Sequence, residues 1–221
     1  MKTIHFKDLF LLFFAATLIF HIPRTYGQET GQATDLDKKV EKFLDKHKYK
    51  WHDMNIPTAD GKVLYNLIIQ NHYKNVLEIG TSTGHSTIWL AWALSKTGGK
   101  LVTIEINESR YRKALINFKE AGLENYIDAK LGDAHKLVPE LKGPFDFVFC
   151  DADKMWYKNY FKDLEHKIVD GGCFAAHQVT PNNNDEAIQN FLDYVKSRPN
   201  FTTTIENEKS SGISISYKTG R

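Results

Sequence analysis

The sequence predicts an α/β fold: a doubly wound, mostly parallel sheet with helices on both faces and an antiparallel hairpin at its C-terminal end. Between residues 63 and 197, short apolar segments alternate with segments of helical periodicity, which is typical of a parallel sheet covered on both sides. Glycines follow three of the predicted helices, where a left-handed C-cap is favoured. Two strands of alternating polarity, joined by a polar turn, follow the last helix and predict the hairpin.

Two helices are expected before the first strand. Asp35 is the predicted cap of the first helix, and apolar residues recur at helical spacing from residue 36 to residue 44. Residues 57–61, which contain a proline and a glycine, separate it from a second helix with inward apolar residues at 63–68. Lysines between 38 and 50 are interrupted by Glu41 and Asp45, which favours a solvated helix face over a binding patch.

From residue 76 onward, strands and helices are expected in turn. Short runs of β-branched, aromatic and aliphatic residues predict strands, and apolar residues three or four positions apart predict helices. The helices end at glycine pairs, at a single glycine or before a proline. The predicted strands are 76–79, 100–106, 127–131, 145–150, 173–177, 201–206 and 213–218, and the predicted helices are 86–94, 109–121, 156–168 and 185–197.

Length and composition limit the classes of protein. The 221 residues suffice for one α/β domain with a sizeable core. The content of 42 % hydrophobic and 25 % charged residues is that of a globular domain. The formal net charge is only +2, which gives no reason to expect nucleic acid as a partner. The oligomeric state stays open between a monomer and a homodimer.

The first 27 residues differ from the rest. Lys2 and Lys7 precede an apolar run at 9–22, and small residues follow up to Gly27, which is the pattern of a signal peptide. The run is short for a membrane-spanning helix, which needs about 20 apolar residues, but an uncleaved anchor is the alternative interpretation. We therefore assign 1–27 to a signal peptide or membrane anchor and 28–221 to a single domain. The protein is then exported or membrane-associated, and cytoplasmic if this segment does not function.

The two cysteines are expected to be buried free thiols. Cys150 falls at the end of one predicted strand and Cys173 near the start of its neighbour. At a rise of about 3.3 Å per residue they are roughly 10 Å apart. That separation is too long for a disulfide bond.

The first strand leads into the pattern Glu78-x-Gly80-x-x-x-Gly84, followed by Ser86. The glycines permit a tight turn, and the free N–H groups of the next helix attract an anion or carboxylate. A dinucleotide-binding protein favours G-x-G-x-x-G instead, and Glu78 would repel a pyrophosphate. A cationic ligand with an amino-acid tail, such as S-adenosylmethionine, fits this pattern better. An ordinary glycine turn of any α/β protein is equally compatible with it.

Acidic residues follow the next two strands as well. Glu105 ends the second strand, where a carboxylate accepts the hydroxyls of a ribose; this marks a ribose and not one particular cofactor. Asp133 follows the third strand, where a carboxylate could hold the edge of an adenine. A turn-forming Gly-Asp pair explains Asp133 equally well.

Charged residues also follow the strongly apolar fourth strand. Asp151, Asp153 and Lys154 stand at its end, where charges near a core are costly unless they serve one another or a ligand. A hard metal ion would use the carboxylates. Lys154 is a candidate general base if burial or nearby positive charge lowers its pKa. A surface turn is the alternative.

Several segments in order resemble the catechol/caffeoyl-CoA O-methyltransferase family. They are MNIPTADG, LEIGTSTGHS, TIEIN, GDA, FDFVFCDADKMWYKNY and VDGGCFAAH, within a similarity that runs from Met54 to the end. The resemblance implies a Rossmann-like seven-stranded sheet, with six strands parallel and one reversed. It also implies methyl transfer from S-adenosylmethionine to a hydroxyl of a small, phenolic or catecholic acceptor.

The resemblance also implies roles for single residues. Asp151 would ligate a divalent cation, and Lys154 would take the proton from the attacking hydroxyl. Trp156 and Tyr157 either wall the substrate mouth or belong to the core. The residues implied in cofactor binding are Glu78, Gly80, Gly84 and Ser86 for the methionine part, Glu105 for the ribose, Asp133 and Ala134 for the adenine, and Asp151 beside them.

One position departs from the family. After the fifth strand the family has Asp-Asn, two further metal ligands, whereas this chain has His177-Gln178. Three interpretations stay open. Asp151, His177 and Gln178 bind a transition metal, for which an imidazole is well suited. Alternatively no metal is bound and His177 is a general base. In the third, the chain binds cofactor without catalysing transfer.

Two other classes of protein remain as alternatives. An NAD(P)-dependent reductase would share the fold and the acidic residue for the ribose. The chain contains Tyr126-x-x-x-Lys130, a spacing that some reductases use, but it falls on a predicted strand, and the glycine turn does not fit. A non-catalytic binding protein at a membrane or outside the cell is the second alternative, suggested by residues 1–27 and by His177-Gln178.

Overall fold

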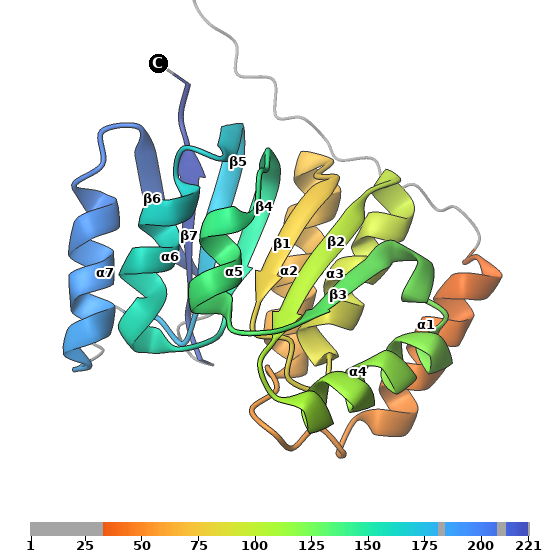
Figure 1. Cartoon of the computed structure of the whole chain (residues 1–221). Coiled ribbons are helices and arrows are strands. Elements are labelled where there is room, and N and C mark those ends of the chain that lie inside the picture. The colour runs from red at the N-terminus through yellow and green to blue at the C-terminus, as the bar shows by residue number, and fades with distance from the viewer. Residues whose placement is uncertain (1–32, 181–183, 207–210, 221) are drawn as a thin grey trace, which may run out of the picture. The chain divides into compact units, whose positions relative to one another are not determined.

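The computed structural model describes residues 33–180, 184–206 and 211–220 (Figure 1). Within this part the chain forms one seven-stranded sheet in the order β3-β2-β1-β4-β5-β7-β6. The strands are β1 (Asn75–Ile79), β2 (Lys100–Glu105), β3 (Ile127–Leu131), β4 (Phe145–Cys150), β5 (Ile168–His177), β6 (Phe201–Glu206) and β7 (Ile213–Lys218). The helices are α1 (Asp35–His47), α2 (Thr58–Asn71), α3 (His85–Thr97), α4 (Glu108–Ala121), α5 (Ala134–Glu140), α6 (Tyr157–Leu164) and α7 (Glu186–Lys196), with short 3-10 helices η1 (Glu124–Tyr126) and η2 (Lys154–Trp156).

The sheet topology confirms the predicted fold. Strands β1 to β5 pair in parallel, and β7 is antiparallel to both β5 and β6. The chain runs outward from β1 through β2 to β3, then returns to the other side of β1 with β4. The strand order therefore reverses between β1 and β4. In sheets of this kind ligands bind at that point, outside the carboxyl ends of the strands.

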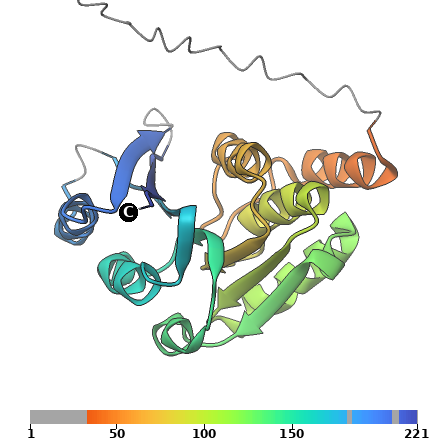
Figure 2. The same cartoon turned by 90° about the horizontal axis from the view of Figure 1, so that it is seen from above.

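Helices cover both faces of the sheet (Figure 2). Because side chains alternate along a strand, Leu77 and Ile79 of β1 pack toward α5, α6 and α7, whereas Val76 packs toward α2 and α3. A third apolar cluster joins α1, α3 and α4. From Phe147 in β4 and from Cys173 in β5, the residues up to the strand ends are buried on both faces, as central strands of such a sheet require.

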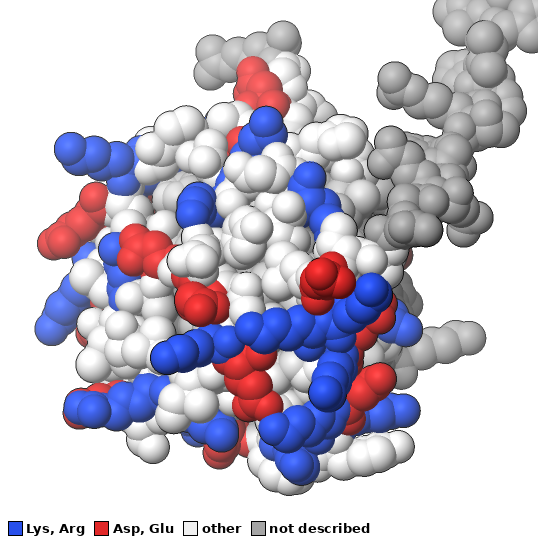
Figure 3. Space-filling model, turned by 90° about the vertical axis from the view of Figure 1, so that its right-hand side faces the viewer, with Lys and Arg blue, Asp and Glu red and all other residues white. Residues whose placement is uncertain are grey.

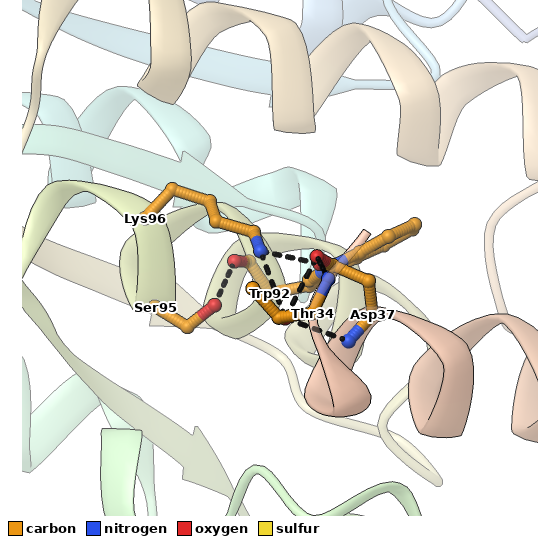
Figure 4. A network of polar contacts seen from close by, with 5 residues as sticks. All are labelled: Thr34, Asp37, Trp92, Ser95 and Lys96. Carbon is orange, nitrogen blue, oxygen red and sulfur yellow. Dashed lines mark hydrogen bonds and ion pairs between the residues drawn. The ribbon is translucent and has the colours of Figure 1, made fainter. Parts of the chain in front are cut away.

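A polar network attaches α1 to α3 (Figure 4). Thr34, not the predicted Asp35, caps α1, because its side chain accepts the N–H of Asp37 while Asp37 accepts the Thr34 N–H at 2.8 Å. The same Asp37 carboxylate accepts the indole N–H of Trp92 at 2.7 Å and pairs with Lys96. Burial alone would raise the pKa of Asp37, but these hydrogen bonds together lower it well below its usual range.

Charges of both signs alternate over the outer surface that includes α1 and α4 (Figure 3). Lys38 pairs with Asp35, Lys46 pairs with Glu120, and Arg112 pairs with Glu108 on α4. This agrees with the predicted solvated face of the first helix. Exposed pairs of this kind contribute little to stability.

Two predicted elements are corrected. The helix predicted over 156–168 is too long, because α6 ends at Leu164. Strand β5 begins at Ile168 and contains the two glycines that were expected to follow the helix. No helix was predicted at the position of α5. This helix has only seven residues and contains Pro139, which ordinarily breaks a helix, so its pattern is that of a loop.

Both cysteines are buried free thiols, as predicted. Cys150 lies opposite Ala176, and Cys173 lies opposite Phe147, so the two thiols stand at different levels of neighbouring strands. The predicted signal peptide or anchor, residues 1–27, lies outside the described residues. In the part of the chain that the structure describes, no helix is both long and apolar enough to cross a membrane.

Candidate functional site

A cavity of about 400 Å³ opens at the carboxyl ends of β1 to β5, where the strand order reverses. The loops that follow five different strands contribute to its wall. The lining residues are Gly80 and Ser82 after β1, Ile104 to Ile106 at the end of β2, Gly132 to His135 after β3, Asp151 to Lys154 after β4 and Gln178 after β5, with Met54, Arg110 and Tyr160 around them.

Most of the predicted site residues meet here. Gly80, Glu105, Asp133, Ala134, Asp151, Lys154 and Gln178 all line the cavity. Three predicted cofactor residues do not line it: Glu78 and Ser86 are buried, and Gly84 begins α3 in a left-handed conformation. His177 is also buried, directly beside the lining residue Gln178.

The turn after β1 is pressed against the end of β4. Gly80 has φ +99°, and a Cβ atom there would clash with the backbone oxygen of Asp151. The N–H of Asp151 in turn donates to the backbone oxygen of Ile79 at 2.9 Å. Only glycine fits at this position, because it lacks the atom that would clash and tolerates positive φ.

Glu105 joins the end of β2 to the same turn. One carboxylate oxygen accepts the N–H of Ser82 at 2.7 Å, and the other accepts the N–H of Asn107 at 2.8 Å. The side chain is 5 % exposed and lines the cavity. A carboxylate accepts about four hydrogen bonds, so each oxygen retains capacity for a ligand hydroxyl.

Glu78 is a fully buried carboxyl group near the end of β1. Its Oε2 accepts the hydroxyls of Thr87 at 2.5 Å and Thr103 at 2.6 Å. Its Oε1 receives no hydrogen bond within the described part of the chain. Burial raises the pKa of Glu78 to about 7, although neighbouring hydroxyls oppose the shift. Glu78 therefore ties the end of β1 to α3 and β2 from inside the fold.

Asp60, His177 and Asp151 form a buried row, which we call the Asp–His–Asp array. His177 Nε2 lies 2.8 Å from Asp60 Oδ2, in a hydrogen bond. His177 Nδ1 lies 3.1 Å from Asp151 Oδ2, an ion-pair contact without the alignment of a hydrogen bond. The side chains of His177 and Asp60 are 2 % and 0 % exposed, and that of Asp151 is 14 % exposed at the cavity.

The fold explains how the array assembles. Cys150 and Ala176 are paired across β4 and β5, so the residues after them, Asp151 and His177, come out side by side. Asp60 is supplied by the first turn of α2. Burial alone would lower the pKa of His177, but the close contact with Asp151, the hydrogen bond to Asp60 and the negative charges of both carboxylates outweigh it and raise the pKa to about 9.

This donor set does not fit a metal ion. Both ring nitrogens of His177 face carboxylate oxygens, so neither presents a free lone pair to a metal. In the described ranges no group of three or more His, Cys, Asp or Glu side chains is arranged as a metal site. His177 is also buried and does not line the cavity, which disfavours it as a general base for a hydroxyl bound there.

Sequence reasoning missed two residues of this site. Asp60 lies 117 positions before its partner His177, and no local pattern links the two. The only available signal was an acidic residue at the start of an otherwise apolar helix. His135 was the other omission: its ring stacks on Trp156 with centroids 3.9 Å apart, and Nε2 lies 3.5 Å from Asp153 Oδ2.

Trp156 and Tyr157, two candidates for the substrate mouth, have different places. Trp156 is half-buried and stacks on the cavity-lining His135. Tyr157 is fully buried and donates its hydroxyl to the backbone oxygen of His177 at 3.2 Å. Tyr157 therefore belongs to the core and supports the strand end that carries the array.

The chain belongs to the O-methyltransferase family, whose sequence model matches residues 30–183. A catechol O-methyltransferase of Niastella koreensis is 39 % identical over 113 residues, 49 % of this chain and 51 % of the relative. A caffeoyl-CoA O-methyltransferase of Medicago sativa is 34 % identical over 134 residues, 58 % of this chain and 54 % of the relative. The chain thus spans about half the length of the curated relatives that it matches.

Solved structures show the same fold. The O-methyltransferase TomG from Streptomyces achromogenes, in complex with S-adenosylmethionine (SAM), is 28 % identical with a TM-score of 0.70. An O-methyltransferase from Bacillus cereus, in complex with S-adenosylhomocysteine (SAH), is 27 % identical with the same TM-score of 0.70. In both comparisons the match covers 83 % of this chain and 91 % of the other.

Proposed function

We propose that this chain transfers a methyl group from SAM to a hydroxyl of a small phenolic or catecholic acceptor. The observation that carries the proposal is the wall of the cavity, where Glu105, the Gly80 turn and Asp133 come together at the reversal of strand order. Family membership supports methyl transfer. The names of the relatives, catechol and caffeoyl-CoA O-methyltransferase, support a phenolic acceptor.

The chemistry of the wall favours a sulfonium nucleoside over a dinucleotide. Glu105 retains acceptor capacity for ribose hydroxyls, and Asp133 with Ala134 begins α5 where an adenine edge would lie. Glu78 adds a buried carboxyl behind the turn. Acidic groups around this turn attract a ligand with an ammonium and a sulfonium charge, and they oppose a pyrophosphate.

The rim of the cavity is apolar. Met54 and Ile106 line the cavity although they are 77 % and 69 % exposed, and Met155, next to the lining Lys154, is 73 % exposed. Large exposed apolar side chains around a cavity mark a binding surface for an apolar or aromatic molecule. A phenolic ring meets that requirement.

Bound SAM supplies an electrophilic methyl group on a positively charged sulfur. The protein has two tasks, which are to hold the acceptor oxygen in line with that methyl carbon and to remove the hydroxyl proton. We assign the second task to Lys154, which accepts the proton at Nζ while the oxygen–carbon bond forms and the sulfur–carbon bond breaks. Asp151 at the same wall keeps its orientation through His177.

The test is transfer of an isotope-labelled methyl group. Purified protein is incubated with methyl-labelled SAM and catechol or caffeic acid, and the products are identified by mass spectrometry. We expect a singly methylated phenol and an equal amount of SAH. Binding of SAM without transfer to any member of a phenol panel would contradict the proposed activity and leave a cofactor-binding protein.

A further inference from the structure

The Asp–His–Asp array contains three ionisable groups from three elements, two of them fully enclosed. Asp60 comes from α2, His177 from the end of β5 and Asp151 from the residue after β4. The two carboxylate oxygens lie 2.8 and 3.1 Å from the two ring nitrogens. Buried carboxylates are costly unless a positive charge or hydrogen-bond donors face them.

The geometry constrains the protons. A neutral imidazole has one N–H and one lone pair, so one of its nitrogens would present a lone pair to a carboxylate oxygen. That arrangement is repulsive at 3.1 Å. An imidazolium places a positive charge between the two carboxylates and removes the repulsion.

We propose that His177 is a built-in cation between Asp60 and Asp151, and that the site works without a divalent metal ion. This proposal rests on the proposed methyl transfer only in one respect, which is the reaction that the site is said to catalyse. The imidazolium neutralises one of the two carboxylates and holds Asp151 at the cavity wall. His177 is a positioning residue, since it is buried and acts through Asp151.

A metal ion would have to displace this arrangement. It would compete with the imidazolium for the two carboxylates, and it would need a deprotonated nitrogen of His177. The Oδ2 atom of each carboxylate already has an oppositely charged partner, at 2.8 or 3.1 Å. The positive charge of the imidazolium would also repel the ion. Replacing His177 by an acidic residue reverses these conditions, because three carboxyl groups would then face one another.

The inference is tested by metal binding with no methyl donor or acceptor present, so its failure is distinct from failure of the proposed function. Protein freed of metal by chelation is titrated with MgCl₂ and with MnCl₂ in a calorimeter. We expect no saturable binding to the wild type. Saturable binding of either ion that Asp151→Asn abolishes would overturn the proposal.

The second experiment asks whether a variant gains metal binding. We expect His177→Asp to bind Mg²⁺ or Mn²⁺ saturably and to gain thermal stability with the ion, whereas His166→Asp, at an exposed histidine, should gain neither. If a folded His177→Asp protein binds neither ion, then the imidazolium of His177 does not occupy a potential cation site, and the proposal is overturned. If this variant does not fold, the wild-type titration still decides.

The third experiment measures the protonation state of His177 directly. In ¹⁵N NMR spectra of the wild type at neutral pH, we expect both ring nitrogens of His177 to have the chemical shifts of an imidazolium. A neutral tautomer at pH 7, with one unprotonated nitrogen, would overturn the proposal. This measurement needs neither activity nor a variant that folds, provided that His177 is assigned through its bonded neighbours.

Discussion

Glu105 accepts the backbone N–H of Ser82 at 2.7 Å, so that the end of β2 and the turn after β1 form one continuous wall of the cavity. The carboxylate is thus fixed before any ligand arrives. Its position beside Gly80 and Asp133 is the geometric basis for the proposed binding of a nucleoside.

The first prediction concerns this carboxylate. Glu105→Gln should weaken binding of SAH about 10- to 100-fold, because hydrogen bonds to a charged group contribute about 1.5–3 kcal/mol. Calorimetric titration measures the change. Glu108→Gln is the matched control, since Glu108 is exposed on α4 and pairs only with solvent-facing groups such as Arg112. Equal affinity of the Glu105 variant and the control would remove the ribose assignment.

The second prediction concerns Lys154. Lys154→Ala should lower turnover about 10²- to 10⁴-fold, the range typical of a lost general base, and leave SAH affinity nearly intact. Steady-state kinetics and calorimetry on the same preparation separate the two effects. Lys162→Ala, at an exposed lysine of α6, should behave as the wild type. Unchanged turnover of Lys154→Ala would reject this residue as the base.

The third prediction is a loss of stability at alkaline pH. The folded pKa of His177, about 9, lies above its ordinary value of 6.5, so its contribution is complete below pH 6.5 and is lost as the pH rises through 9. At about 1.4 kcal/mol per pH unit, the loss is on the order of 3 kcal/mol.

Urea unfolding at pH 6.5, 8 and 9.5 measures this loss. Glu78 contributes in the same direction, but in a lower window that ends near its folded pKa of about 7. A wild-type free energy of unfolding that is constant from pH 7 to 9.5 would disprove the account of His177. His177→Gln, if it folds, should remove the pH dependence between pH 7 and 8. Above that range the buried thiols of Cys150 and Cys173, whose pKa values burial raises, lower the stability of both proteins.

The fourth prediction concerns the attachment of α1 to α3. Asp37→Asn should lower the free energy of unfolding by about 1–3 kcal/mol, because the carboxylate pairs with Lys96 and accepts the Trp92 indole N–H. Asp45→Asn, at an exposed residue of the same helix, should change it little.

The same network should weaken in acid. The folded pKa of Asp37 is depressed, so its contribution is complete above the ordinary value of 3.8 and is lost as the pH falls below that value. Chemical denaturation at pH 3 and pH 6 should therefore show a smaller difference between wild type and Asp37→Asn at pH 3. An equal difference at both pH values would contradict this role.

The sheet could be predicted because its strands are apolar and regularly spaced. The cavity wall could be predicted because Glu105, Asp133 and Asp151 each lie at the end of a strand or within two residues after it. The carboxyl ends of parallel strands lie at one edge of the sheet, so residues that end different strands come close together in the fold. Asp151 and His177 were grouped only through the resemblance to the family, as possible metal ligands, and the pairing of β4 with β5 explains why they are neighbours.

The partner of His177 could not be predicted in this way. Asp60 reaches the strand ends from α2, and only the packing of α2 on the sheet brings its carboxylate within 2.8 Å of the imidazole. Without Asp60, a lone histidine at a strand end indicated either a metal ligand or a base. The missed α5 has a similar cause, since Pro139 hides a helix that capping by Asp133 and packing maintain.

One measurement tests the central claim most directly: calorimetric titration of the wild-type protein with SAH and, separately, with NAD⁺. The account predicts saturable binding of SAH with one ligand per chain and no binding of NAD⁺. Uptake of NAD⁺ together with indifference to SAH would contradict it, because the cavity would then be a dinucleotide site.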